Sequence, residues 1–327
     1  MKYLLLFTLL FPLSGFVPMT AKPTTYTNPV WNKDFPDPFV LPYKGKFYAY
    51  ATETGGHKGF QVMESPDLVN WTHKGVAFKP DWSEIHYWAP EVLERNGTFY
   101  MTYSAENPVT KKHDIAVATS DNPLSGFVHR AVLVRGDDNK VGVIDATIFI
   151  DSDKTPYLIY SEEEPRRIVL RKMASDMLAV VGERVELMKP DREVEKGVTE
   201  APTLIKRGGK YHLFYSTGWF QSNKPDANYS VWHSVASCLT GQYVKDAAPL
   251  VKTVADSTYG PGHQTLITLP SGEWWMIYHG WDAQNEPRYG SNPIGRSMWI
   301  DRLKWNGNTP TMQGATTTPQ SAPKLKR

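Results

Sequence analysis

The sequence has little of several features that would point to other classes of protein. Cys238 is the only cysteine, so no disulfide can form within the chain and a packed core must supply the stability. The 36 basic and 34 acidic residues leave a net charge of +2, which gives no electrostatic basis for binding nucleic acid or an anionic membrane. Long helical periodicity is absent, and beyond the first residues no stretch is apolar enough to span a membrane. These absences favour a globular β-rich protein with an uncharged ligand.

The first residues have the layout of a secretory signal peptide. Lys2 is followed by an apolar run over residues 4–11, which is too short to cross a bilayer. We expect residues 1–21 to be a signal peptide whose cleavage site is left open between Gly15 and Ala21. The mature protein is then expected to be exported to the periplasm or the extracellular space of a bacterium, without a membrane span.

Aromatic residues make up 13% of the chain, and many of them recur in one phrase that occurs five times. The phrase reads as a turn followed by an aromatic-rich strand, and its aligned positions are Ala51, Tyr103, Tyr160, Tyr215 and Tyr278. Their separations of 52, 57, 55 and 63 residues match a four-stranded propeller blade. The sequence therefore predicts an all-β, five-bladed β-propeller with four antiparallel strands per blade, in a single domain over residues 22–315. The Thr/Pro/Lys-rich residues 316–327 are expected to form a loosely held C-terminal tail.

The same repeat predicts which residues line the propeller axis. The first strand of each blade faces the axis, so equivalent positions on these strands form a ring. Counting back 15 residues from the aligned tyrosines, or 14 from Ala51, gives the predicted strand starts Asp37, Trp88, Asp145, Glu200 and His263. Four of the five are ionisable, whereas residues that repeat only for the fold would be alike. This variety favours a functional pocket on the axis.

The three carboxylates of this ring suit the hydrolysis of a glycosidic bond. Taken singly, Asp37, Asp145 and Glu200 each read as a turn, cap or surface residue. Together they supply an acid to protonate the leaving oxygen, an opposing carboxylate to activate water or attack directly, and a third acid to tune and orient the first. A metal site that includes His263 is the main competing hypothesis, but the sequence has no local cluster of ligands such as a calcium loop.

Several motifs, in chain order, resemble glycoside hydrolase family 43. They are Asn28-Pro29-Val30 with Asp34-Phe35-Pro36-Asp37-Pro38, Tyr87-Trp88-Ala89-Pro90-Glu91-Val92, Val143-Ile144-Asp145, Glu200-Ala201-Pro202, and Gly262-His263 with Trp274-Trp275-Met276-Ile277-Tyr278-His279-Gly280. The resemblance runs along nearly the whole mature chain. It implies a five-bladed propeller, in agreement with the repeat, and an inverting mechanism on arabinose- or xylose-containing plant polysaccharides.

The resemblance also implies a role for each acid. Asp37 corresponds to the general base that deprotonates water, Glu200 to the general acid, and Asp145 to the carboxylate that tunes and orients Glu200. Asp34 is set aside as the base because it lies three residues before the predicted strand start. Inversion requires the carboxyl groups of the base and the acid to be about 6.5–9.5 Å apart, which leaves room for a water molecule.

Further residues are expected to bind the substrate. Trp88 could form a wall on which a sugar stacks. His263 is expected to line the channel, and the resemblance implies that it holds water or, through water, a structural Ca²⁺; the alternative is a hydrogen-bonded histidine without metal. No cofactor is expected to be required. The resemblance places Arg296 beside the base or the substrate, with a surface arginine as the alternative. Pocket-shaping or merely packed residues are expected in four loop positions, His57, Trp219, Phe220 and Trp281.

The first hypothesis for function is an exo-acting α-L-arabinofuranosidase whose partner is arabinan, arabinoxylan or a derived oligosaccharide. β-Xylosidase and endo-α-1,5-arabinanase are the alternatives within the family, and the motifs do not separate the three. The sequence shows no counterpart of the long C-terminal β-sandwich that many xylosidases of the family carry, which favours arabinose. A carbohydrate-binding propeller without turnover is the alternative from another class, and the retention of all three acids argues against it.

Overall fold

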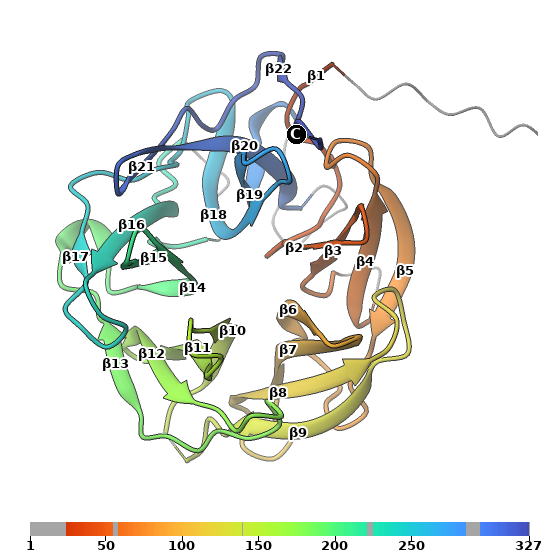
Figure 1. The fold of residues 1–327 in the computed structure, drawn as a ribbon, viewed down its shortest axis with the longest axis vertical. Coiled ribbons are helices and arrows are strands. Elements are labelled where there is room, and N and C mark those ends of the chain that lie inside the picture. Colours follow the sequence, from red (N-terminus) through yellow and green to blue (C-terminus); the bar gives the residue numbers. More distant parts are fainter. Residues whose placement is uncertain (1–23, 55–57, 139, 221–224, 286–294, 327) are drawn as a thin grey trace, which may run out of the picture.

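The protein is a ring of five antiparallel sheets. The computed structural model describes residues 24–54, 58–138, 140–220, 225–285 and 295–326. Each sheet has four strands, and the five sheets stand around one axis as the blades of a propeller (Figure 1). The prediction of an all-β, five-bladed propeller with four strands per blade is confirmed. Within the described ranges, no helix has the length and apolar character needed to cross a membrane.

Each blade is one continuous segment of chain, with its strands in order from the axis outward. Blade 1 contains β2 (Phe39–Tyr43), β3 (Lys46–Ala51), β4 (Phe60–Ser65) and β5 (Thr72–Phe78). Blade 2 contains β6 (Trp88–Arg95), β7 (Thr98–Glu106), β8 (His113–Ser120) and β9 (Val128–Val134). Blade 3 contains β10 (Val143–Ile150), β11 (Pro156–Glu163), β12 (Arg166–Lys172) and β13 (Val185–Met188).

The last two blades follow the same order. Blade 4 contains β14 (Glu200–Arg207), β15 (Lys210–Thr217), β16 (Ser230–Ala236) and β17 (Val244–Lys245). Blade 5 contains β18 (Thr258–Thr268), β19 (Trp274–Asp282), β20 (Ser297–Asn306) and β21 (Thr309–Met312). Outside the blades lie β1 (Thr25–Tyr26), β22 (Gln320–Ser321) and the short 3-10 helices η1 (Glu193–Glu195) and η2 (Ala283–Asn285).

The hydrophobic core is divided among the five interfaces between neighbouring blades, with one buried cluster at each. Successive side chains of a strand point to opposite faces, so the second strand of each blade serves two clusters. In β3, Tyr48 and Tyr50 pack toward blade 2, while Phe47 and Ala49 pack toward blade 5. Burial on both faces explains why the repeated aromatic phrase is a continuous apolar run rather than an alternating one.

The ring closes where the N-terminal segment lies along blade 5. The Val30 amide donates to the carbonyl of Met298 at 3.0 Å, and the Phe35 amide donates to the carbonyl of Arg296 at 2.9 Å. Among the described residues, each of the five sheets is built from consecutive strands, and the first and last blades exchange no strand. Closure therefore depends on these segment-to-blade contacts and on packing between β2 and β18.

The C-terminal residues are held more closely than their composition indicates. β22 pairs with β1, and the Lys324 amide donates to a carboxylate oxygen of Glu273 at 3.0 Å. Leu325 packs against the core cluster between blades 5 and 1. The sequence predicted a loosely held tail over residues 316–327, and this arrangement differs from it. Composition alone cannot predict backbone pairing with β1 or a hydrogen bond to the buried Glu273.

Every inner strand has a left-handed residue just before it or within it, on the axial side of the ladder that leads to the first hairpin. Asp37, Ala89, Asp145, Ala201 and His263 all have φ between 47° and 56°. In blades 2 to 5 this residue and the next one form a bulge, because two residues there face one residue of the second strand. These five positions are the true structural equivalents. The sequence count was therefore one residue early in blades 2 and 4, where it selected Trp88 and Glu200.

The displacement comes from the length of the first hairpin in each blade. In blades 1, 2 and 4 two residues connect the first and second strands, whereas residues 151–155 and 269–273 form longer connections in blades 3 and 5. The longer connection adds one residue between the left-handed position and the aligned tyrosine. A single count therefore could not fit all five blades.

Asp301 on β20 gives a prediction about stability. Its carboxylate is buried and accepts hydrogen bonds from Thr316 Oγ1 at 2.5 Å and from the Tyr278 hydroxyl at 2.6 Å. Burial outweighs these bonds and raises the pKa of Asp301 to about 6, from 3.8. The folded protein thus holds this proton more tightly than the unfolded chain, so the free energy of unfolding falls as pH rises from about 4 to 6, by on the order of 3 kcal/mol.

We predict that Asp301→Asn removes this pH dependence. Urea unfolding should show the stability of the variant rising relative to wild type between pH 4 and pH 7. Asp151→Asn should show the opposite sign, because Lys206 and Tyr211 outweigh burial and lower the pKa of Asp151. A difference between Asp301→Asn and wild type that does not change with pH would contradict the prediction.

Candidate active site

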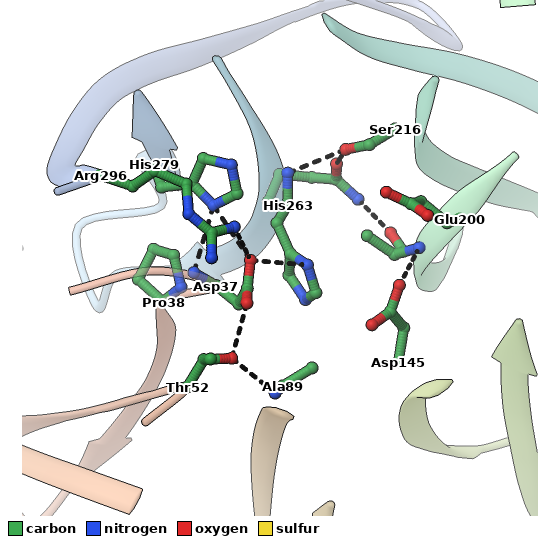
Figure 2. A network of polar contacts seen from close by, with 12 residues as sticks. Asp37, Pro38, Thr52, Ala89, Asp145, Glu200, Ser216, His263, His279 and Arg296 are labelled. Atoms are coloured by element: carbon green, nitrogen blue, oxygen red, sulfur yellow. Dashed lines mark hydrogen bonds and ion pairs between the residues drawn. The ribbon is translucent and has the colours of Figure 1, made fainter. Parts of the chain in front are cut away.

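Three of the left-handed residues donate hydrogen bonds from their backbone amides to the neighbouring blade. The Ala89 amide donates to Thr52 Oγ1 of blade 1 at 2.8 Å, and the Ala201 amide donates to Asp145 Oδ2 of blade 3 at 3.0 Å. The His263 amide donates to Ser216 Oγ of blade 4 at 2.8 Å (Figure 2). A bulge releases its amide from the sheet ladder, so a buried acceptor must satisfy it. The acceptors bind one blade to the next around the axis.

Asp37 lies at the closure between blades 1 and 5. Its Oδ1 accepts a hydrogen bond from Arg296 Nη1 at 2.8 Å and lies 3.3 Å from His263 Nδ1. Its Oδ2 accepts from Thr52 Oγ1 at 2.6 Å. Its amide donates to Nδ1 of His279 at 3.1 Å, so that nitrogen is the acceptor of a neutral imidazole. Three blade segments thus fix one carboxylate.

The surroundings of Asp37 stabilise its charged form. Burial alone would raise the pKa of Asp37, but the charge of Arg296, assisted by His263, holds it well below its ordinary value. Burial lowers the pKa of His279 to about 3, which agrees with its acceptor role. The surroundings of Asp37 therefore favour an ionised carboxylate.

Asp34 has a different position. It accepts a hydrogen bond from the Arg296 amide at 2.9 Å, and burial raises its pKa. A side chain at Gly295 would place its Cβ 1.8 Å from Asp34 Oδ1, so glycine is required for this close approach. Asp34 and Gly295 therefore fix the backbone from which Arg296 reaches Asp37.

Asp145 and Glu200 lie together on the other side of His263 (Figure 2). Both side chains are buried. Burial, and next to it the negative charges of Glu200 and Asp37, raise the pKa of Asp145 well above its ordinary value. This side of the site thus favours a bound proton, whereas the side of Asp37 favours a negative charge.

Two residues that sequence reasoning missed hold the carboxylate of Glu200. The Tyr229 hydroxyl donates to Oε1 at 2.7 Å, and Arg166 Nη1 donates to Oε2. Arg166 begins β12, Tyr229 immediately precedes β16, and Arg296 immediately precedes β20. All three belong to the start of the third strand of a blade. Extending the repeat alignment from first strands to third strands would have found them as a second ring.

Tyr229 also links the two halves of the site. Its ring stacks on the His279 imidazole, with centroids 5.7 Å apart and an interplanar angle of 6°. A Cβ at Gly262 would lie 2.0 Å from Cε1 of Tyr229, so the glycine lets the ring approach β18. The ring therefore spans from the residue that contacts Asp37 to the hydroxyl that contacts Glu200.

Three of the aromatic residues expected at the pocket pack against histidine or arginine side chains. Trp88 is partly exposed and packs on His113, with ring centroids 4.0 Å apart and an interplanar angle of 31°. The Arg166 guanidinium lies 5.4 Å from the centroid of Trp219, and the Arg296 guanidinium lies 4.9 Å from that of Phe220.

Two other loop residues were expected to shape the pocket. Trp281 is buried and its Nε1 donates to the Phe220 carbonyl at 2.9 Å, so it fixes the backbone at Phe220. His57 lies outside the described residues.

The site offers few side chains that could bind a cation. Among the residues that the structure describes, no group of three or more His, Cys, Asp or Glu side chains could hold a metal ion. His263 Nδ1 faces Asp37 Oδ1, so a cation near this histidine would need water for most of its coordination. The expected Ca²⁺ held through water stays a prediction.

Comparison with known proteins agrees with this geometry. The extracellular endo-α-(1→5)-L-arabinanase 1 of Bacillus subtilis is 24% identical over 84% of this chain and 86% of its own length. The extracellular exo-α-(1→5)-L-arabinofuranosidase of Streptomyces avermitilis is 23% identical over 87% of this chain and 62% of its own length. Other relatives are named as β-xylosidases.

A solved structure and a family model extend the comparison to the whole propeller. The crystal structure of a thermostable family-43 glycoside hydrolase superposes with a TM-score of 0.80 and 34% identity, over 92% of this chain and 99% of that one. The model of glycosyl hydrolases family 43 matches residues 26–310. The chain therefore belongs to this family of inverting glycoside hydrolases with three catalytic carboxylates.

Proposed function

We propose that this family 43 enzyme is an exo-acting α-L-arabinofuranosidase in which Asp37 is the general base and Glu200 the general acid. Asp145 tunes and orients Glu200 in this proposal. The observation that carries the roles is the contrast between the two sides of the site. One side holds a carboxylate ionised beside Arg296, and the other holds two adjacent buried carboxyl groups.

An ionised carboxylate suits the activation of water. Asp37 accepts a proton from the attacking water as the oxygen bonds to the anomeric carbon. Arg296 keeps Asp37 charged before the reaction, and His279 fixes its backbone. Because Asp37 is held by three partners, its free lone pair has a defined direction.

A pair of adjacent carboxyl groups suits the delivery of a proton. Two buried carboxylates close to each other cannot both be charged without cost, and burial together with the charge of Glu200 raises the pKa of Asp145 well above its ordinary value. Glu200 gives a proton to the glycosidic oxygen as the bond between that oxygen and the anomeric carbon breaks. Asp145 also accepts the Ala201 amide, next to Glu200 in the chain, which orients the strand start that carries the acid.

Relatives support arabinose as the sugar. Two of the relatives described above are named for α-(1→5)-L-arabinan linkages, one as an endo-acting and one as an exo-acting enzyme. β-Xylosidase and endo-α-1,5-arabinanase stay the alternatives within the family. The names of these relatives also describe extracellular enzymes, which supports the proposal that residues 1–21 are a signal peptide and the enzyme is exported. Residues 1–23 lie outside the described part of the chain.

The first experiment identifies the substrate and the acid. We expect wild type to hydrolyse 4-nitrophenyl α-L-arabinofuranoside faster than the β-D-xyloside, without loss of activity after chelation, and to release the β-anomer first in proton NMR. Glu200→Ala should lower kcat on arabino-oligosaccharides by about 10²–10⁴-fold, because the leaving sugar then departs without protonation. Glu193→Ala is the matched control, since that side chain is 96% exposed.

Other outcomes separate the alternatives. Faster hydrolysis of the xyloside would indicate a β-xylosidase, and cleavage of arabinan within the chain would indicate an endo-arabinanase. Full activity of Glu200→Ala on oligosaccharides would contradict the proposed acid. Binding of sugar without turnover by wild type would favour a binding propeller. Loss of activity on chelation, restored by Ca²⁺, would show a required cation.

The second experiment tests the base through the pH profile. Arg296 holds the pKa of Asp37 down, so Arg296→Met should raise it. The reaction needs ionised Asp37, and activity is lost as pH falls through its pKa. We therefore expect the acidic limb of kcat/KM to move to higher pH by about one unit or more in the variant. Arg302→Met, which removes an arginine of β20 that pairs with Glu273, should leave the limb in place. An unmoved limb in Arg296→Met would argue against Asp37 as the base.

A further inference from the structure

Both carboxylate oxygens of Glu200 accept hydrogen bonds in this structure. Tyr229 donates to Oε1 at 2.7 Å and Arg166 donates to Oε2. Arginine is a cation with N–H donors and no acceptor, so its contact with Oε2 disfavours a proton on that oxygen. In this arrangement Glu200 is a hydrogen-bond acceptor at both carboxylate oxygens. A general acid must instead carry a proton on an oxygen that faces the glycosidic oxygen.

Movement of Arg166 away from Oε2 would therefore favour a proton on this oxygen. Its guanidinium already has a second contact, because it lies 5.4 Å from the centroid of the Trp219 ring. Among the described residues, its one side-chain hydrogen bond is the bond to Glu200. Its other N–H groups are thus available to a ligand. The side chain of Arg166 is 16% exposed, so a ligand must come close to reach it.

Trp219 is open to a ligand on the same side. The residue is 46% exposed, although tryptophan is usually well buried. Its amide donates to Asn228 Oδ1 at 2.8 Å, which fixes the backbone of this exposed ring. Aromatic faces of this kind stack on the apolar faces of sugars. An exposed tryptophan and an arginine with free donors together match a neutral, hydroxyl-rich ligand.

The position of this pair identifies the part of the substrate that it meets. In an inverting reaction the leaving group departs on the side of the acid, while water attacks from the side of the base. Arg166 contacts Glu200, whereas the corresponding arginine on the other side, Arg296, contacts Asp37 and lies against Phe220. Arg166 and Trp219 therefore lie on the side of the leaving group.

We propose that Arg166 and Trp219 form the subsite for the leaving sugar, and that a sugar bound there draws Arg166 away from Glu200. This inference rests on the proposed role of Glu200 as the acid. The sugar stacks on Trp219, and its hydroxyl oxygens accept hydrogen bonds from the guanidinium. Occupancy of the subsite thereby makes the acid ready for reaction.

The protons balance in this scheme. As Arg166 leaves, Glu200 takes up one proton from solvent at Oε2, and Arg166 stays positively charged. Glu200 passes that proton to the glycosidic oxygen while the carbon–oxygen bond breaks, and Asp37 receives one proton from the attacking water. Departure of the leaving sugar returns Arg166 to the Glu200 carboxylate, and Asp37 releases its proton to solvent.

The experiment compares two leaving groups on the sugar that wild type hydrolyses. One substrate is an oligosaccharide, whose leaving group is a sugar that needs protonation. The other is the 2,4-dinitrophenyl glycoside, whose leaving group departs without an acid and is not a sugar. We expect Arg166→Gln to raise KM for the oligosaccharide by at least about tenfold, and to change kcat/KM for the dinitrophenyl glycoside by less than about threefold. Trp219→Ala should show the same split.

Arg167→Gln is the matched control, because the neighbouring arginine pairs with Glu186 and Glu162 instead. This variant should hydrolyse both substrates with unchanged KM and kcat/KM. Arg166→Lys should recover part of the affinity for the oligosaccharide, since lysine keeps a charged donor. Circular dichroism and the intact rate on the dinitrophenyl glycoside show that each variant is folded.

The outcomes separate this inference from the proposed function. If wild type prefers a xyloside, the proposed substrate is wrong, and the same comparison on xylo-oligosaccharides tests the subsite. An equal loss of kcat on both substrates with unchanged KM would mean that Arg166 only supports the structure around Glu200, which would overturn the inference. Unchanged kinetics of Arg166→Gln on the oligosaccharide would overturn it as well.

Discussion

The arrangement of the site depends on one backbone constraint, the left-handed residue just before or within every inner strand. This conformation costs an ordinary L-residue roughly 1–2 kcal/mol, so it persists only where surrounding contacts enforce it. The enforcing contacts are hydrogen bonds from Ala89, Ala201 and His263 to the preceding blade. The strain recurs in all five blades, and these contacts fix three of the five positions around the axis.

The shared constraint supports two electrostatic environments that differ. On the closure side, the partly exposed Arg296 keeps Asp37 charged. On the opposite side, the burial of Asp145 next to Glu200 favours a retained proton. The stacked rings of Tyr229 and His279 fill the space between these environments and contact both. A hydrolase that must take a proton at one point and give it at another is served by this separation.

Much of the fold and part of the site followed from the sequence. The aromatic phrase predicted five blades because each second strand is buried on both faces and leaves a continuous apolar run. The register failed by one residue at Trp88 and Glu200 because hairpin length varies between blades. Glu200 still reaches the site, since it directly precedes the left-handed Ala201.

Other site residues lay beyond the reach of the repeat. Arg166 and Tyr229 come from third strands, where no repeated phrase marks the register, and their contacts cross from one blade to another. The sequence register placed Asp34 three residues before Asp37. Asp34 also accepts a hydrogen bond from the Arg296 amide. This contact forms only when the ring closes, so strand pairing within one blade cannot reveal it.

The construction of each blade from one continuous segment has a consequence for when the site exists. Arg296 and Asp37 are 259 residues apart in the chain, whereas Asp145 and Ala201 are 56 apart and belong to adjacent blades. During synthesis, blades 3 and 4 with their two carboxyl groups emerge before blade 5. Asp37 therefore lacks its contact with Arg296 until the last blade has formed. The charge on the carboxylate of the first blade is thus a property of the finished ring, and a chain that lacks blade 5 has only one half of the chemistry.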